Sequence, residues 1–358
     1  MKILRRRKTQ IAVIGGIHID VLADYKISEQ GKIDKIGELN YSIGGTAYNI
    51  AHFLHNDNVP VDFFSVLNQN SFSTSWIKRE IRHTRINYFF QYESKEYFEN
   101  GFIAIRKEGE LENAVTSSFL SKVQLDISLI KKIIKGKKIV ALDCNFASRQ
   151  LIDIFEICKR ENVLTVISST SDSKVNRIKV IAKSYNIDFV IMNEKEARVF
   201  FQKDIKFIKA SEIPPSIKNL VITCGEKGYF VYSQNEKARY PAPHITEIES
   251  TSAAGDALVA AIVRTLKSNT AFSWNICSKY INKYVSEALS QRCTYIKPTR
   301  KKKSYKALFI WLFVFLIILL TLATFVSSEN SDITILFAII SIILAIGQII
   351  RSELMSED

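Results

Sequence analysis

Before residue 297, short unbroken apolar runs alternate with segments in which apolar residues recur at helical spacing. Runs that are apolar throughout are typical of strands buried on both faces of a parallel sheet. The repeated order of strand and helix predicts an α/β fold, a doubly wound sandwich with helices on both faces of a mostly parallel sheet. The predicted strands are Ile11–Ile14, Ile139–Leu142, Leu164–Ile167, Phe189–Met192 and Leu220–Thr223. The predicted helices are Tyr48–His55, Thr74–Arg82, Lys174–Ser184, Glu194–Phe201, Asp256–Leu266 and Trp274–Leu289.

Two segments, 33–43 and 86–114, depart from this order because polar and apolar residues alternate along them. Alternation with a period of two is typical of strands that have one exposed face. Glu108–Gly109 provides a turn signal within the second segment. Together they predict a small antiparallel sheet beside the main one.

The C-terminal part contains two long apolar runs, Ala307–Val326 and Ile333–Ile350, of 20 and 18 residues. A helix of about 20 apolar residues spans the roughly 30 Å hydrocarbon core of a bilayer. Neither run contains a charged residue, and the short polar segment 327–332 joins them. They predict a two-helix transmembrane hairpin, and the alternative is a helical hairpin buried in a soluble core.

The net charge of +13 is concentrated in two short stretches. Residues 1–8 carry five positive charges and residues 297–306 carry six, which leaves +2 for the rest of the chain. The second stretch adjoins the first apolar run and predicts a basic juxtamembrane linker that contacts the lipid bilayer. The positive-inside rule then puts residues 1–306 and the tail 351–358 in the cytoplasm, at the inner membrane. The first stretch is either a solvated arm or a second lipid contact, and no nucleic-acid partner is expected.

Several classes of protein receive no support from the sequence. The five cysteines are scattered and form no CxxC or Cys/His cluster, so neither a structural zinc site nor a disulfide framework is predicted. The N-terminal apolar stretch Ile11–Ile14 is too short for a signal peptide. Neither GxxxxGK[ST] nor GxGxxG is present, so the sequence does not indicate a P-loop or a dinucleotide-binding Rossmann site.

Glycines and polar residues follow the predicted strands, at the edge where ligands bind in doubly wound sheets. Gly15–Gly16 and then Asp20 follow the first strand. Asp20 is either a turn residue or a carboxylate that accepts hydrogen bonds from two vicinal sugar hydroxyls. Gly44–Gly45 precede Asn49 at a predicted helix start. Paired glycines let the backbone approach a ligand and the Asn49 amide offers a donor and an acceptor, although a plain helix start explains the same pattern.

Two further strand ends have both a structural and a functional interpretation. Asn193 and Glu196 fit a capping box at a helix start, and Glu196 also fits the outer shell of a hydrated Mg²⁺. Thr223, Gly225 and Gly228 follow the fifth predicted strand. They form either an ordinary glycine turn or a border for nucleotide phosphates.

The segment 250–256, Ser-Thr-Ser-Ala-Ala-Gly-Asp, precedes a helix of small and apolar residues. A helix of that composition is buried, so its N-terminus points into the protein. Free N–H groups and the helix dipole form an anion site at such an N-terminus. Asp256 at the mouth of this site is suited to accept a proton from an attacking hydroxyl, although acidic residues also favour helix starts for structural reasons.

In this order, the motifs over residues 9–296 resemble those of the ribokinase, or PfkB-type, carbohydrate kinase family. The stretches similar to its N- and C-terminal signatures are Gly44–Gly45…Asn49–Ile50–Ala51 and Thr251–Ser252–Ala253–Ala254–Gly255–Asp256. Those similar to its intermediate motifs are Asp143–Cys144–Asn145, Asn193…Glu196 and Thr223…Gly225…Gly228. Within the family, pseudouridine kinases are the closest likeness, through the segment 15–20, the segment 101–111, and Ser171–Lys174 with Arg177–Ile178.

The resemblance implies a ribokinase-like αβα sandwich with a small β lid over about 33–43 and 86–114. It also implies transfer of the ATP γ-phosphoryl group to the primary hydroxyl of a nucleoside or sugar, with pseudouridine as the first candidate and with Mg²⁺ and a monovalent cation as cofactors. Asp256 would be the base, and the backbone N–H groups of Ala253, Ala254 and Gly255 the anion hole. The other implied contacts are Asp20, Gly44, Gly45 and Asn49 for the substrate; Asn193, Thr223, Gly225 and Gly228 for the nucleotide; Glu196, through water, for the metal; and Asp143, Asn145 and Lys174 as further site residues. Family lids often pair, so 86–114 is also a candidate homodimer contact.

The chain departs from the family pattern at three places. Ala253 stands where Gly is usual, Ser250 stands where Asp is frequent, and the segment 67–73 lacks the usual Gly-x-Asp-x-x-Gly turn. An alanine held at positive φ would be strained by of order 1 kcal/mol. The sequence therefore supports two hypotheses: an active membrane-anchored kinase, or a catalytically weak nucleoside- or nucleotide-sensing domain that controls the hairpin as a membrane effector.

Overall fold

The computed structural model describes residues 9–94, 99–108, 110–233, 236–245, 248, 253–268 and 272–290. All of them belong to one structural unit, residues 1–298. The arm 1–8, the linker 297–306, the predicted hairpin 307–350 and the tail 351–358 lie outside the described residues. Within the described ranges, no helix is long and apolar enough to cross a bilayer.

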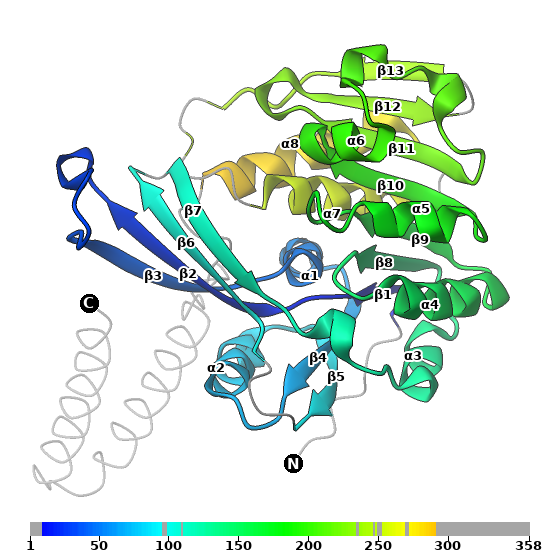
Figure 1. Cartoon of the computed structure of the whole chain (residues 1–358). Helices are drawn as coiled ribbons and strands as arrows, with labels where there is room; N and C mark the ends of the chain where they lie inside the picture. The colour runs from blue at the N-terminus through cyan, green and yellow to red at the C-terminus, as the bar shows by residue number, and fades with distance from the viewer. Residues whose placement is uncertain are drawn as a thin grey trace, which may run out of the picture. The chain divides into compact units, whose positions relative to one another are not determined.

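The apolar runs form a central sheet with the strand order β13-β12-β11-β10-β9-β8-β1-β4-β5 (Figure 1). The strands from β5 to β11 pair in parallel, and β12 and β13 extend the sheet antiparallel. All five strands predicted from the sequence belong to this sheet. Its members are β1 (Ile11–Ile14), β4 (Val61–Asn68), β5 (Asn87–Glu93), β8 (Ile139–Asp143), β9 (Leu164–Ser168), β10 (Ile187–Asn193), β11 (Ile217–Thr223), β12 (Tyr229–Ser233) and β13 (Glu236–Tyr240).

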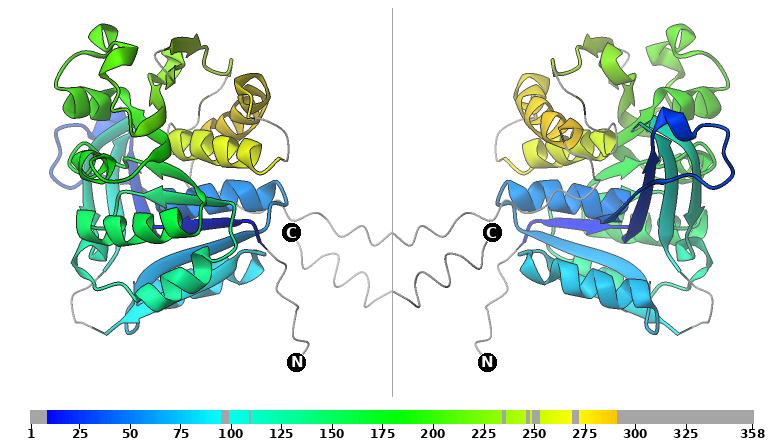
Figure 2. Two further views of the ribbon diagram at one scale, coloured as in Figure 1. Left: turned by 90° about the vertical axis from the view of Figure 1, so that its right-hand side faces the viewer. Right: turned by 90° about the vertical axis from the view of Figure 1, so that its left-hand side faces the viewer.

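Helices cover both faces of this sheet, which gives the predicted three-layer sandwich (Figures 1 and 2). Alternate residues of a strand point to opposite faces, so Ile11 and Val13 of β1 join one hydrophobic cluster and Ala12 and Ile14 join the other. The first cluster holds α1 (Thr46–Asn56), α2 (Phe72–Glu80), α7 (Ala254–Leu266) and α8 (Trp274–Leu289). The second holds α3 (Ile127–Ile134), α4 (Ser148–Arg160), α5 (Asn176–Ala182) and α6 (Glu194–Phe201).

A second, smaller sheet has the strand order β3-β2-β6-β7 and forms the lid. The strand β2 pairs antiparallel with β3 and parallel with β6, so the lid is a mixed sheet rather than the antiparallel one predicted. The segment 86–114 is also divided, because β5 joins the edge of the main sheet and the lid strand starts at Gly101. The lid strands are β2 (His18–Tyr25), β3 (Gly37–Gly44), β6 (Gly101–Lys107) and β7 (Glu110–Ser117).

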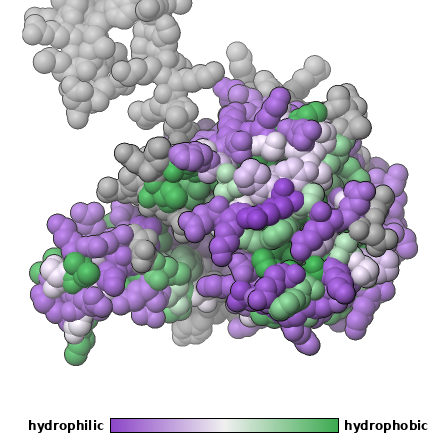
Figure 3. All heavy atoms as spheres, turned by 90° about the horizontal axis from the view of Figure 1, so that it is seen from above, coloured by the Kyte–Doolittle hydropathy of each residue, from purple (hydrophilic) through white to green (hydrophobic). Residues whose placement is uncertain are grey.

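One face of the lid is apolar and exposed. Val21 pairs with Tyr41 and Ile103, and Ile103 pairs with Val115, so these four residues form one row across all four strands. Tyr41, Ile103 and Val115 are 59%, 52% and 69% exposed. Hydrophobic patches among hydrophilic residues are visible on the lid at the left of Figure 3. We call this row of four residues the outer lid face.

Candidate active site

Asp143 holds the carboxyl ends of β1 and β8 together. It is the last residue of β8 and is fully buried. Its Oδ2 accepts hydrogen bonds from the N–H groups of Gly16, at 2.7 Å, and Ala47, at 3.3 Å, and its Oδ1 accepts one from Asn145 at 2.9 Å. A Cβ on Gly15 would lie 2.4 Å from the Asp143 carboxyl carbon. The carboxylate therefore fixes the turn after β1, the start of α1 and the loop after β8.

The glycine pair before α1 lets the lid come close to this edge. A Cβ on Gly44 would lie 2.2 Å from Oδ2 of Asp20, which is a buried residue of β2. Gly45 has φ of 110°, and a Cβ there would lie 2.5 Å from the carbonyl oxygen of Gly16. Larger residues at either position would push Asp20 or the β1 turn away, so the pair positions a carboxylate beside the start of α1.

Asn49 and Asp256 meet from two helices that are distant in the sequence. Asn49 lies in the first turn of α1 and is 5% exposed, and its Nδ2 donates a hydrogen bond of 2.8 Å to Oδ2 of Asp256 in the first turn of α7. The Oδ1 of Asn49 is buried and has no hydrogen-bond partner among the described residues. A buried acceptor without a partner is costly, so a ligand hydroxyl would satisfy it well.

The carboxyl of Asp256 is electrostatically unusual. Burial raises its pKa from 3.8 to about 7, and the neighbouring carboxylates of Asp143 and Asp20 act in the same direction. Hydrogen bonds from Asn49 and Thr46 oppose this shift. A carboxylate with a pKa near neutrality is a far better proton acceptor than an ordinary aspartate.

The residues predicted to form the anion hole lie at the N-terminus of α7. Ala253 is the N-cap residue and has φ of 62° and ψ of 2°, in the left-handed region. Ala254 and Gly255 follow in the first turn, where helical N–H groups lack intrahelical acceptors. Gly255 is exposed, and beyond its own helix and its chain neighbours no described residue has an atom within 4 Å of where its Cβ would be. The N-terminal turn of α7 is therefore exposed at Gly255, the residue directly before Asp256.

The ends of β10 and β11 bring two further predicted residues together. Asn193 and Thr223 are partners in the parallel register of these strands. Asn193 and Glu196 form the predicted capping box, with Asn193 N–H donating to Glu196 Oε2 at 2.7 Å and Glu196 N–H donating to Asn193 Oδ1 at 2.9 Å. The same Oε2 accepts a hydrogen bond from Ser169 Oγ, and burial raises the pKa of Glu196. The structure therefore contains the predicted capping box, and the role of Glu196 near Mg²⁺ stays a prediction.

The turn after β11 depends on glycine at one position more than at the other. Gly228 has φ of 86°, and a Cβ there would lie 2.0 Å from the carbonyl oxygen of Tyr240. Gly225 has φ of 58°, but no atom lies within 4 Å of where its Cβ would be. Glycine is therefore required at 228 for packing against the end of β13, whereas at 225 only the positive φ favours it.

Two cations lie near the loop after β8. Lys174 Nζ donates a hydrogen bond of 2.6 Å to Asn145 Oδ1, and burial lowers the pKa of Lys174. Arg177 donates to the carbonyl oxygens of Cys144, Asn145 and Phe146 at distances of 2.7 to 3.0 Å.

The contacts of Arg177, Thr46 and Ser169 were not predicted from the sequence. Their hydrogen-bond partners lie far away in sequence or on another element, so no local pattern indicates these contacts.

A comparison with protein-family models agrees with the resemblance seen in the sequence motifs. The model of the pfkB family of carbohydrate kinases matches residues 8–275. Among curated protein sequences, none matches this chain at a significant level.

Three solved structures illustrate the likeness of the fold. Ribokinase from Giardia lamblia aligns with a TM-score of 0.68 at 15% identity, covering 80% of this chain and 96% of its own. Adenosine kinase from Sinorhizobium meliloti aligns with a TM-score of 0.65 at 16% identity, covering 82% and 98%. Arabidopsis thaliana ribokinase, solved with ribose and ATP, aligns with a TM-score of 0.65 at 14% identity, covering 80% and 94%. At these identities the likeness concerns the fold, and it confirms the predicted ribokinase-like α/β sandwich.

Proposed function

Because this chain belongs to the pfkB family of carbohydrate kinases, which are phosphotransferases acting on hydroxyl groups, we propose that it phosphorylates the primary hydroxyl of a nucleoside or sugar with ATP. Pseudouridine, giving pseudouridine 5′-phosphate, is the first candidate substrate, on the strength of the segments 15–20, 101–111 and 171–178. The observation that carries the proposal is the carboxyl of Asp256, which lies at the N-terminus of α7, is held by Asn49 and has a pKa of about 7.

In the proposed reaction Asp256 is the general base. The substrate hydroxyl oxygen forms a bond to the γ-phosphorus while the bond from that phosphorus to the β–γ bridging oxygen breaks. The hydroxyl proton passes to Asp256, and the bond electrons leave with ADP. The first-turn N–H groups of α7, at Ala254 and Gly255 and with Ala253 as their N-cap, face the charge that develops on the transferred group. Phosphoryl transfer depends mainly on such positioning and charge stabilisation.

The substrate is proposed to bind between the lid and α1. The free acceptor of Asn49 and the carboxylate of Asp20 are suited to hydroxyl groups, and Gly44 and Gly45 give the backbone room beside them. Asp143 acts indirectly, because its oxygens are already bonded to backbone amides. Lys174 and Asn145 border the same edge of the sheet and are proposed as further contacts.

The nucleotide is proposed to lie over the ends of β10 and β11, beside Asn193, Thr223 and Gly225, with Gly228 shaping the turn. No group of three or more metal-ligating side chains occurs within the part of the chain that the structure describes. Glu196, whose carboxylate lies at the end of β10, is proposed as an outer-shell acceptor for Mg²⁺, which usually keeps several waters and binds substrate phosphates. When bound, Mg²⁺ would neutralise phosphate charge. A monovalent cation remains part of the proposal on the family resemblance alone.

The panel that tests the function contains pseudouridine, uridine, adenosine, ribose and fructose, each with ATP·Mg²⁺ and the full-length protein. We expect turnover of one nucleoside, lowered about 10²- to 10⁴-fold in Asp256→Asn by loss of the general base. Asp153→Asn, a partly exposed aspartate of α4, is the matched control and should keep full activity. Turnover that survives Asp256→Asn unchanged would exclude this mechanism.

The alternative function is a catalytically weak nucleoside- or nucleotide-sensing domain that controls a membrane effector hairpin. The observation that favours it is Ala253 in the left-handed region at the anion loop. Measurable binding of a panel member without phosphorylation of any of them would support the sensor over the kinase.

We also propose that 307–350 tethers the protein to the inner membrane, with the kinase domain and the tail 351–358 in the cytoplasm. The support is the two uncharged runs and the basic stretch 297–306. In alkaline carbonate extraction the full chain should stay with the membrane pellet, whereas a chain ending at Pro298 should not. Release of both into the supernatant would contradict the tether.

The outer lid face supports a homodimer through the lid, because exposed apolar rows of this kind mark interaction surfaces. Ile103→Lys places a charge in the middle of the row. Sedimentation of the chain ending at Pro298 should show a dimer that Ile103→Lys converts to a monomer. A monomer in both cases would exclude this contact.

A further inference from the structure

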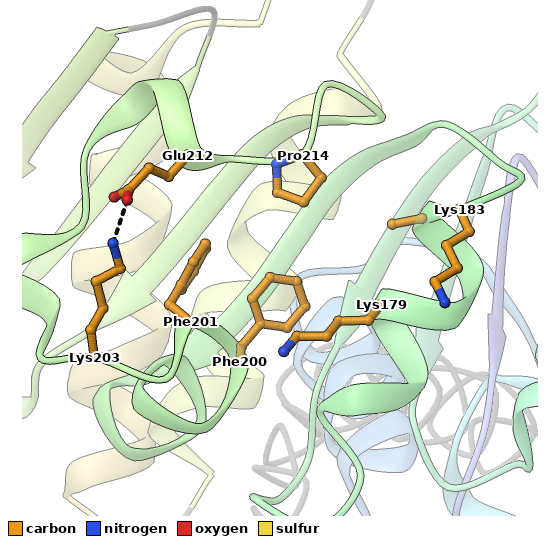
Figure 4. Close-up of a pocket in the computed structure, with 8 residues that line it drawn as sticks. Lys179, Lys183, Phe200, Phe201, Lys203, Glu212 and Pro214 are labelled. Carbon is orange, nitrogen blue, oxygen red and sulfur yellow. Dashed lines mark hydrogen bonds and ion pairs between the residues drawn. The ribbon is translucent and has the colours of Figure 1, made fainter.

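A pocket of about 460 Å³ lies on the α5–α6 face of the sandwich, apart from the candidate active site (Figure 4). Its lining residues come from α5, from the end of α6 and from the segment before β11. This segment and α5 lead into the amino ends of β11 and β10, whereas the candidate active site uses their carboxyl ends. The lining residues are Lys179, Ala182, Lys183, Phe200, Phe201, Lys203, Glu212 and Pro214.

The floor and wall of the pocket are aromatic. Phe200 is 3% exposed, Phe201 is partly exposed, and their ring centroids lie 4.8 Å apart in an edge-to-face arrangement. Figure 4 shows both rings between the Lys203–Glu212 pair and the lysines of α5. Phe201 therefore offers a partly open ring to a planar ligand.

The pocket carries an unbalanced positive charge. Three lysines and one glutamate line it, a formal charge of +2. The glutamate is fully engaged, because Glu212 pairs with Lys203 through Oε1 and accepts the N–H of Lys209 through Oε2 at 2.8 Å. Lys179 lies 5.0 Å from the centroid of the Phe200 ring, and neither it nor Lys183 has an ion-pair partner among the described residues. Two ammonium groups thus remain available at the edge of an aromatic hollow.

A simpler reason for lysines at this place is the helix dipole, since cations are favourable at the C-terminal end of α5. The last turn of α3 has the same feature in Lys131 and Lys132, but these two residues do not line this pocket. The dipole does not account for the aromatic hollow or for the engaged glutamate beside it. The pair on α3 is therefore a natural internal control.

The geometry points to a second ligand site, which binds a small phosphorylated compound with a planar ring, its phosphate at Lys179 and Lys183 and its ring against Phe201. The volume lies in the range of roughly 300 to 1,000 Å³ that is common for small-molecule sites. Lysine ammonium groups recognise phosphate oxygens through charge-assisted hydrogen bonds. This inference does not depend on the proposed function, because it concerns binding at the other end of the strands.

The test uses AMP as the probe and hydrogen–deuterium exchange of the full-length protein in detergent as the readout. AMP should slow exchange in peptides covering 179–185 and 199–214, in addition to any protection near 193 and 223–228. Adenosine and inorganic phosphate, which lack one half of the probe, should protect the α5–α6 peptides less at equal concentration. Protection confined to the 193 and 223–228 peptides would overturn the proposal.

Variants separate this site from the helix-dipole explanation. Lys179→Met/Lys183→Met should weaken the AMP-dependent protection of the pocket about tenfold or more, as expected for the loss of one or more charge-assisted hydrogen bonds. Lys131→Met/Lys132→Met should leave it unchanged. Phe201→Ala should weaken AMP but not inorganic phosphate. Equal AMP binding by both double variants and the wild type would show that the pocket lysines serve only the helix.

Discussion

Two aspartates at the same edge of the sheet, Asp143 and Asp256, have opposite surroundings. Asp143 is fully buried, and both of its carboxylate oxygens accept hydrogen bonds from backbone N–H groups. The carboxyl of Asp256 instead receives a side-chain hydrogen bond from Asn49, and burial raises its pKa to about 7. The first carboxylate is committed to the fold, and the second remains able to exchange a proton.

The comparison shows that residue type and position at a strand or helix end do not by themselves identify a reactive group. The decisive property is how many of the acceptor positions of the carboxylate already receive hydrogen bonds from the protein. Three backbone N–H groups satisfy Asp143, and these bonds build the turn, helix start and loop that border the site. Asp256 lies where burial disfavours its charge and where two other carboxylates are near, so its proton affinity is high.

The largest expected effect is on stability, from truncating the committed carboxylate. Asp143→Ala leaves three backbone N–H groups without their acceptor, and each buried unsatisfied donor costs about 1–3 kcal/mol. We expect the free energy of unfolding to fall by about 3–5 kcal/mol, measured by urea denaturation of the chain ending at Pro298. Asp143→Asn keeps one acceptor oxygen and should lose less.

Asp256→Ala provides the contrast in the same assay. It removes a carboxyl whose charged form is disfavoured by burial, so the free energy of unfolding at pH 8 should stay the same or increase. A loss of stability in Asp256→Ala as large as that in Asp143→Ala would mean that both carboxylates are structural.

The next effect is the pH dependence of turnover. Because only the deprotonated form of Asp256 accepts a proton, kcat/KM should fall about tenfold per pH unit below a pKa of about 7. The free energy of unfolding should change in the opposite direction, because the contribution of Asp256 falls as pH rises. The folded-state pKa is raised, so the stability that this group contributes is fully present below its ordinary pKa of 3.8 and is lost as pH rises through about 7.

Both profiles can be measured on the same protein, by initial rates and by thermal unfolding across pH 4 to 9, about the range over which a perturbed carboxyl titrates. In Asp256→Asn the stability change between pH 4 and 8 should be smaller than in the wild type. An acid limb of kcat/KM near pH 4 would show that burial does not raise the pKa of the base in solution.

The fold was largely predictable where neighbours in sequence determine burial. The unbroken apolar runs became strands of the main sheet, and Glu194–Phe201 and Trp274–Leu289 have the bounds expected from their spacing. The lid was predicted less well. His18–Tyr25 mixes polar and apolar residues and was not recognised as β2, and Asn87–Glu93 joined the main sheet because β4 offered it a parallel partner.

The candidate site was likewise predictable only where its residues are close together in the sequence. The helix start at Asp256 and the capping box at Asn193 are local patterns, and the structure contains both. The hydrogen bond from Asn49 to Asp256 joins residues 207 positions apart, and the clamp from Asp143 to Gly16 joins residues 127 positions apart. Only the strand order brings these pairs together, so a single sequence suggests the members of the site without showing which of them are already satisfied.

The smallest expected effect concerns the loop that faces Asp256. Ala253 has φ of 62°, which glycine adopts freely and alanine only with strain. Ala253→Gly should therefore raise the free energy of unfolding by at most about 1 kcal/mol, partly offset by the greater freedom of glycine in the unfolded chain. Ala257→Gly, within the same helix and fully buried, is the matched control and should destabilise. If Ala253→Gly also raises kcat severalfold, the native alanine limits the anion loop of a working kinase. If it stabilises the fold and leaves every panel substrate unphosphorylated, the strained loop belongs to a sensor.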